Sequence, residues 1–196
     1  MKTLDFGDSF NRYIKYNSKI NTWSMNDEDG DVISIDPPKF VMDLERLKTA
    51  WLYFREGQAP SVFVDDDGVM APEPEGGNHK RGFVVELYSI SLGLRDLSSC
   101  SLNLKKAMKL VYADFERNRA QYPGQLPIIQ VTGYIEAPSQ YGMNYQPVFA
   151  IVGWTPRPPE LGGTHGGTPD TGNPAPAVEV KVDEPQADML DDVVPY

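Results

Sequence analysis

One segment of the chain has the periodicity of an α-helix, and it is LNLKKAMKLVYADFERNR, residues 102–119. Its main apolar residues recur three or four positions apart, as on the buried face of an amphipathic helix. They are Leu104, Met108, Val111 and Phe115. Ser101 stands where an N-cap serine would, and Pro123-Gly124 ends the connection that follows. The flanking segments have a different pattern, so a single helix is expected.

Alternating apolar and polar residues predict strands on both sides of this helix. Three precede it and two follow it: Arg12–Trp23, Lys39–Arg55, Arg81–Leu92, Leu126–Ala137 and Gln146–Trp154. Lys39–Arg55 also has some helical spacing, but its aromatic residues and the preceding prolines favour a long, bent strand. The resulting order is β-β-β-α-β-β. We therefore expect a mainly β fold of the OB type, a five-stranded Greek-key barrel with its helix between the third and fourth strands.

The composition of the chain changes near Pro156–Glu160. From Glu160 onward, 37 residues hold five Gly, five Pro and one aromatic residue, Tyr196. Such a segment buries too little apolar surface to offset the entropy of ordering it. The expected organisation is an OB-fold domain over 1–159 and a disordered acidic tail over 160–196.

The charge of the chain at first argues against a nucleic-acid binder, because the formal net charge is −10 and phosphate contacts need Lys and Arg. The charge is unevenly distributed, however. The tail holds eight acids and one base, whereas residues 80–159 hold nine bases and five acids. The body is therefore able to present a basic face while the tail and the loops stay acidic.

Aromatic residues stand next to bases at several places in the body. Single-strand binders use this mixture, because bases stack on rings while Lys and Arg follow the backbone. The residues expected to stack bases are Tyr13, Trp23, Tyr141 and Tyr145. Those expected to contact phosphates are Lys15, Lys19, Lys48, Arg81 and Arg157. Trp51 and Trp154 are expected in the core more than at the surface.

The C-terminus has the order of a linear binding motif, with two acids before a short apolar end that closes on Pro-aromatic. The residues expected to bind a partner are Asp191, Asp192, Val193, Val194, Pro195 and Tyr196. The ring would fill an apolar pocket on the partner while the acids pair with basic residues at its rim. The plainer alternative is a solvated acidic terminus.

This tail resembles the acidic tip of bacterial single-stranded DNA-binding proteins, which recruits replication, recombination and repair enzymes. Those tips usually end in Pro-Phe, whereas this chain ends in Pro195-Tyr196. The body resembles phage-type single-stranded DNA-binding proteins through DLERLKTAWLYF (residues 43–54), Ala59-Pro60 and Pro147–Pro158. The resemblance implies an OB-fold that binds single strands during phage or prophage DNA replication or recombination.

No enzyme motif stands out in the chain. One cysteine and two histidines in loop-like segments make a Cys/His zinc site implausible, and the acidic loop at Asn26–Asp31 fails calcium-loop spacing. Neither a phosphate-cradling Gly-Lys-Ser/Thr loop nor a Gly-x-Ser-x-Gly elbow occurs. We expect no catalytic residues, no metal and no cofactor.

Two hypotheses follow. The first is a sequence-independent single-stranded DNA-binding protein, and the alternative is a protein-binding adaptor or virion accessory module on the same barrel. The chain has no apolar run of about 18 residues and no apolar N-terminal segment, so a cytoplasmic location is expected. That the cytoplasm is that of a bacterial host is what the resemblance implies. The oligomeric state, monomer or homo-oligomer, stays open.

Overall fold

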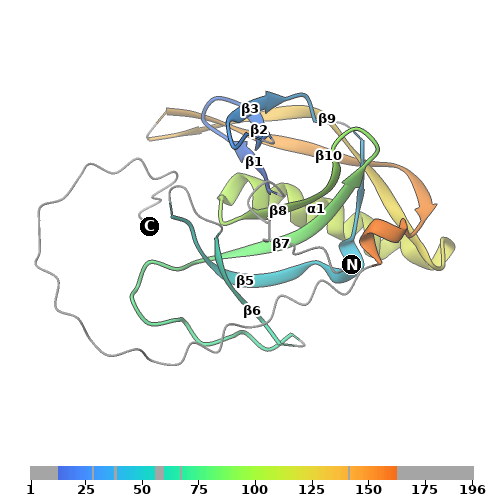
Figure 1. Cartoon of the computed structure of the whole chain (residues 1–196), viewed down its shortest axis with the longest axis horizontal. Coiled ribbons are helices and arrows are strands. Elements are labelled where there is room, and N and C mark those ends of the chain that lie inside the picture. The colour runs from blue at the N-terminus through green and yellow to red at the C-terminus, as the bar shows by residue number, and fades with distance from the viewer. Residues whose placement is uncertain are drawn as a thin grey trace, which may run out of the picture.

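The computed structural model describes residues 13–27, 29–37, 39–55, 60–66, 68–140 and 142–162. In that part of the chain, ten strands and one α-helix form a mainly β body (Figure 1). The strands are β1 (Tyr13–Asn17), β2 (Thr22–Asn26), β3 (Val32–Ile35), β4 (Phe40–Met42), β5 (Lys48–Tyr53), β6 (Ser61–Val64), β7 (Lys80–Ser89), β8 (Gly93–Ser99), β9 (Gln125–Ser139) and β10 (Gly142–Pro156). The helix is α1 (Leu102–Asn118), and the short 3-10 turns are η2 (Leu44–Arg46), η3 (Arg119–Gln121) and η4 (Pro159–Leu161).

All ten strands belong to one sheet with the order β10-β9-β4-β7-β8-β1-β2-β3, in which β5 also pairs with β7 and carries β6 at its other edge. β1 and β8 run parallel, and the other pairs are antiparallel. The sheet curls into a half-barrel. Its closing contact is a 2.8 Å hydrogen bond from the backbone N–H of Tyr145 on β10 to the carbonyl oxygen of Ser18, just past β1.

The predicted helix over 102–119 is confirmed as α1 followed by η3. Its predicted apolar face is buried in the core together with Ala107. Large side chains from the sheet complete this core, among them Trp23, Phe40, Leu87 and Ile129. Ser101 is the N-cap residue, as expected, but its side chain makes no capping hydrogen bond.

Three of the five predicted strands are confirmed, as β7, β9 and β10. Lys39–Arg55 is not one bent strand, because η2 separates β4 from β5. The side chain of Asp43 accepts a 3.3 Å hydrogen bond from the backbone N–H of Arg46 and so stabilises this break.

Arg12–Trp23 is not one strand either. The chain reverses after Asn17, and β1 and β2 form an antiparallel hairpin. Asn21 closes the turn with φ of +52°, a left-handed conformation that Asn tolerates better than most residues. The alternation of side chains continues across the turn, which hides the reversal in the sequence.

The expected five strands are too few, since the described residues form ten. The strands that were not predicted include β3, β6 and β8. In β8, the segment GLRDLSS has only two apolar side chains, and it follows a tight turn that Gly93 permits with φ of +68°. β3 and β6 are short and mostly exposed, so neither has a clean alternation of buried and exposed residues.

The packed body extends beyond the expected boundary at 159. Leu161 in η4 is fully buried, and its carbonyl oxygen accepts hydrogen bonds from Arg46 (3.1 Å) and Arg157 (3.2 Å). The predicted tail lies outside the described residues from 163 onward, and with it the tip at 191–196. No helix in the described part of the chain is long and apolar enough to cross a membrane.

Candidate nucleic-acid interface

The structure divides the predicted DNA-binding residues among three places. Tyr13, Lys15 and Lys19 lie on β1 and the turn after it, and Tyr145 lies beside that turn on β10. Lys48 and Arg81 lie on β5 and β7. Arg157 follows β10, and Tyr141 is outside the described residues. These residues therefore come from several elements of the sheet and not from one strand.

Trp23 is not an exposed stacking platform, because only 2% of its surface is accessible. The β1–β2 register pairs it with Tyr16, so both side chains point into the half-barrel. Their rings lie 4.8 Å apart, and the indole Nε1–H donates to the hydroxyl of Tyr134 at 3.2 Å. Trp23 is a core residue whose polar edge is satisfied by a neighbouring tyrosine.

Arg157 is a structural cation and not a phosphate contact. Its guanidinium pairs with Asp43, whose side chain is 0% exposed, and with Glu45 at 2.7 Å. The hydrogen bond to Asp43 is the largest cause that raises the pKa of Arg157. A buried carboxylate needs such a partner, so Arg157 is committed to holding the end of β10 on η2.

A cluster that we name the tyrosine junction joins the β1–β2 turn to the β9–β10 hairpin, and it consists of Tyr16, Tyr134, Tyr145 and Asn21. The Tyr16 hydroxyl lies 3.0 Å from both the side-chain oxygen of Asn21 and the carbonyl oxygen of Tyr145. The rings of Tyr16 and Tyr134 are nearly parallel, with centroids 6.2 Å apart. Burial is the largest cause that raises the pKa of Tyr16, which keeps its hydroxyl protonated as a donor.

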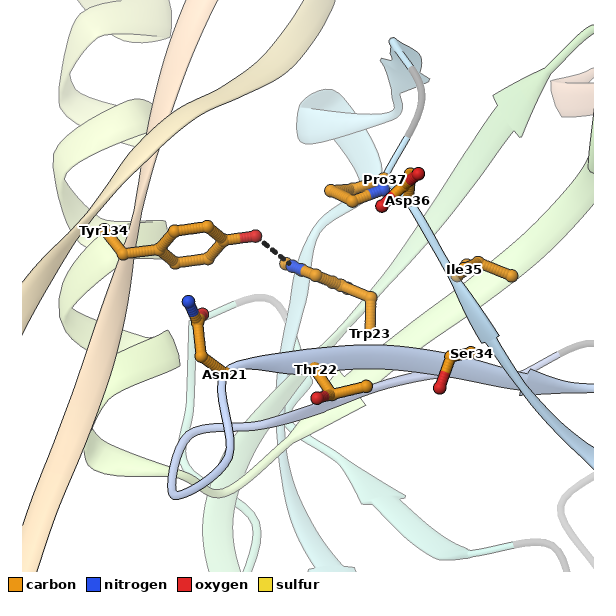
Figure 2. A pocket seen from close by; sticks show the side chains of 8 residues that line it. All are labelled: Asn21, Thr22, Trp23, Ser34, Ile35, Asp36, Pro37 and Tyr134. Atoms are coloured by element: carbon orange, nitrogen blue, oxygen red, sulfur yellow. Dashed lines mark hydrogen bonds between the residues drawn. The ribbon is translucent and has the colours of Figure 1, made fainter.

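A pocket of about 370 Å³ opens beside this junction, and we name it the Trp23 pocket. Its lining residues are Asn21, Thr22, Trp23, Ser34, Ile35, Asp36, Pro37 and Tyr134. Figure 2 shows Tyr134 reaching from β9 toward Trp23, while Asp36 and Pro37 come from the segment after β3. The pocket combines an exposed tyrosine ring with several polar groups.

The richest combination of rings and cations lies elsewhere, on a surface that we name the aromatic ribbon: Trp51, Tyr53, Phe63 and His79. The register pairs Trp51 with both Arg81 and Phe63, so these side chains share one face of β5, β6 and β7. The guanidinium of Arg81 lies 5.2 Å from the Trp51 ring centroid. Arg55 lies 5.0 Å from that of Tyr53.

His79 occupies the centre of this surface. Its ring centroid is 5.4 Å from that of Tyr53 and 5.2 Å, edge-on, from that of Phe63. A pocket of about 270 Å³ opens here, which we name the Tyr53 pocket. Its lining residues are Tyr53, Arg55, Ser61, Phe63, Glu75, Gly76, Asn78 and His79. This volume falls just below the range of about 300–1,000 Å³ typical of sites for drug-sized ligands, so it suits one ring.

A polar network holds Arg81 over Trp51. Asp65 accepts hydrogen bonds from the guanidinium of Arg81, from the Thr49 hydroxyl and, at 3.0 Å, from the backbone N–H of Ala71. The bond from Arg81 is the largest cause that lowers the pKa of Asp65. The indole N–H of Trp51 donates to the Ala71 carbonyl oxygen at 2.9 Å, so the same loop orients ring and cation together.

The sequence did not single out the aromatic ribbon, although one signal was present. Thr49, Trp51 and Tyr53 alternate within the segment, which placed them on one side of a strand. Phe63 lies outside every predicted strand, so there was no reason in the sequence to expect its ring at the surface. In the structure, 46% of its surface is exposed. Within the described part of the chain, no group of three or more His, Cys, Asp and Glu side chains is placed to hold a metal ion.

Comparisons of the chain with protein-family models, with curated proteins and with solved structures found no match.

Proposed function

We propose that this protein binds single-stranded DNA, with the aromatic ribbon as its main contact surface. The observation that carries the proposal is the pairing of ring and cation on one sheet face: Arg81 with Trp51, and Arg55 with Tyr53. Nucleobases stack on aromatic rings and on guanidinium planes, at about 1–3 kcal/mol per base on a ring. An Arg held against a ring presents its outer plane to a base. Because Asp65 neutralises the charge of Arg81, the charge that would attract the adjoining phosphate is that of Arg55.

Exposed lysines elsewhere on the body would supply further phosphate contacts. Lys48 and Lys80 lie on the paired strands β5 and β7, but the register places them on the other face from Trp51 and Arg81, so a bound strand would reach them by passing from one face to the other. Lys15 and Lys19 lie on β1 and in the turn after it. Phosphate pairing and ring stacking are both indifferent to base identity, which accounts for binding without sequence preference.

We also propose that the body is an enlarged OB-type barrel. The broken strand β4–β5 pairs with β7, β7 pairs with β8, α1 follows, and β9–β10 returns to β4. This succession has the strand order of an OB-fold with its helix after the third strand. The meander β1–β3 would then be an addition that fills the space between β8 and β10.

The proposed role of the tail is recruitment of replication or recombination proteins through Asp191–Tyr196. In support of this role, η4 fixes the point where the tail leaves the body: Leu161 is buried, and its carbonyl oxygen accepts a hydrogen bond from Arg46 of η2. As a tethered polyanion, the tail would compete with DNA for the basic residues of the body. A pull-down with the full chain against the Tyr196→Ala chain tests recruitment apart from DNA binding.

The test of DNA binding is fluorescence anisotropy with labelled oligo-dT and with a duplex of the same length, at about 50 mM salt. We expect the full chain to bind the single strand more tightly and to lose affinity steeply as salt rises. Tyr53→Ala and Phe63→Ala should weaken binding, while Tyr122→Ala, at an aromatic residue outside the ribbon, serves as control. Equal affinity for the duplex, or no binding at all, would overturn the proposal.

The alternative, a protein-binding adaptor, has one observation in its favour. Apolar side chains in the ribbon and near it are exposed, and such groupings mark protein contacts. They are Phe63, Val64, Val69 and Met70. An adaptor predicts a chain that ignores oligo-dT in the same experiment, so the anisotropy measurement separates the two functions.

A further inference from the structure

We infer that the Trp23 pocket is a subsite for one nucleobase that carries an amino group, with guanine bound best and thymine worst. The inference rests on the proposed function and adds a base preference at a single position. The lining of the pocket contains one acidic residue, Asp36, and no Lys, Arg or His. A phosphate would be repelled there, so the ligand part that enters must be neutral or positive.

The pocket offers hydrogen-bonding groups that the fold leaves unused. Asn21 accepts from Tyr16 through its side-chain oxygen, which leaves its amide nitrogen turned toward Tyr134 and Trp23 (Figure 2). Ser34 and Asp36 lie at the edge formed by β3, and no described residue forms an ion pair with the Asp36 carboxylate. A ligand therefore meets donors from Asn21 and acceptors from Asp36.

A flat ring also has a place to stack in this pocket. Tyr134 is 37% exposed although its hydroxyl is fixed by Trp23 and its ring lies parallel to Tyr16. The ring is held rigidly, so little entropy is lost when a base stacks on it. Trp23 beneath is almost fully buried and cannot swing out to fill the pocket.

The chemistry of Asp36 selects among bases. A carboxylate accepts hydrogen bonds only, so it favours exocyclic amino groups, as when Asp or Glu accepts from cytosine. Guanine presents two neighbouring donors on its Watson–Crick edge, which match the two carboxylate oxygens. Thymine presents a single N–H between two carbonyl oxygens, which the carboxylate repels. Lys19 lies in the turn that carries Asn21, where a phosphate next to the bound base would be attracted.

The test compares a labelled dT strand of about 12 nucleotides with the same strand carrying one central dG. The full chain should bind the dG strand about fivefold to tenfold more tightly, because it can slide until the guanine fills the pocket. Asp36→Asn should remove most of this preference, by weakening binding of the dG strand and slightly strengthening binding of plain dT, because the carboxylate that repels the thymine carbonyls is gone. The matched control Asp29→Asn, at another exposed acid of the meander, should keep it.

Equal affinity for both strands, with binding of dT intact, would overturn the subsite and leave the proposed function standing. A guanine preference that survives in Asp36→Asn would also overturn it. Failure to bind either strand would overturn the proposed function, and the subsite with it. Circular dichroism of both variants separates a lost preference from a lost fold.

Discussion

Arg157 forms an ion pair with Asp43, and the Asp43 side chain is completely buried while that of Arg157 is 24% exposed. The pair connects the residue after β10 with the break between β4 and β5. It therefore holds together two segments that are far apart in the chain and fixes the end of the longest hairpin. Leu161 adds its carbonyl oxygen to the same guanidinium.

Arg157→Met should destabilise the fold by about 3 kcal/mol, because it leaves the buried Asp43 carboxylate with only the 3.9 Å contact to Arg46 as a counter-charge. Urea unfolding of the full chain measures the change. Arg117→Met, at an exposed ion pair on α1, is the control and should cost well under 1 kcal/mol. Adding Asp43→Asn to Arg157→Met should restore part of the loss. If Arg157→Met left the stability unchanged and weakened DNA binding, Arg157 would be a phosphate contact and not a structural cation.

This role of Arg157 could not be deduced from sequence. A basic residue three positions after Trp154 is equally consistent with a phosphate contact and with a buried ion pair, and its partner Asp43 lies in the distant segment Lys39–Arg55. By contrast, α1 and the strands β7, β9 and β10 were predicted correctly, because each buries one regular face and the pattern records it. Local periodicity is visible in a sequence, whereas pairings across the sheet are not.

The candidate site was only partly predictable for the same reason. Trp23 was expected at the surface because its alternation with Lys15 and Lys19 was followed straight through the turn at Asn21. The aromatic ribbon was missed through the opposite error, in which a surface ring was expected to be buried. Trp51 was expected in the core because large rings usually are buried, but whether a layer covers the face of β5 depends on tertiary packing.

The body should need residues 160–162, which were first assigned to the tail. A chain ending at Pro159 should lose about 2–4 kcal/mol of stability relative to one ending at Gly162, because it removes the fully buried Leu161 side chain. Thermal or urea unfolding of the two truncated chains measures the difference. The chain that ends at Gly162 should keep its affinity for oligo-dT or gain some, as the tethered acids are removed. Equal stability of the two would mean that η4 contributes nothing to the fold.

The free energy of unfolding should fall at acid pH as Asp65 becomes protonated. Its hydrogen bonds to Arg81 and Thr49 lower the pKa of Asp65 in the folded state. A lowered pKa stabilises the fold above the unfolded value of about 3.9, and this contribution is lost as the pH falls from there toward the folded value. Asp65→Asn should therefore be less stable than the parent chain at pH 7. The difference in unfolding free energy between the two chains should become smaller below about pH 4. Urea midpoints at several pH values measure it, with Asp66→Asn as control. A gap that stays constant with pH would contradict this account.

Arg55 and Phe63 both line the Tyr53 pocket. Their substitutions should weaken DNA binding in two different ways. Arg55→Ala removes a phosphate contact, so the slope of log affinity against log salt should become shallower by about 0.7 for single strands. Phe63→Ala removes a stacking surface, so affinity should fall about fivefold or more with the slope unchanged. Anisotropy titrations with oligo-dT at four salt concentrations separate the two effects, and Arg117→Ala on α1 controls for loss of one exposed positive charge. If both variants changed the slope alike, or neither changed the affinity, the strand would have to follow another surface, and the exposed face of β5 to β7 would be left for a protein partner.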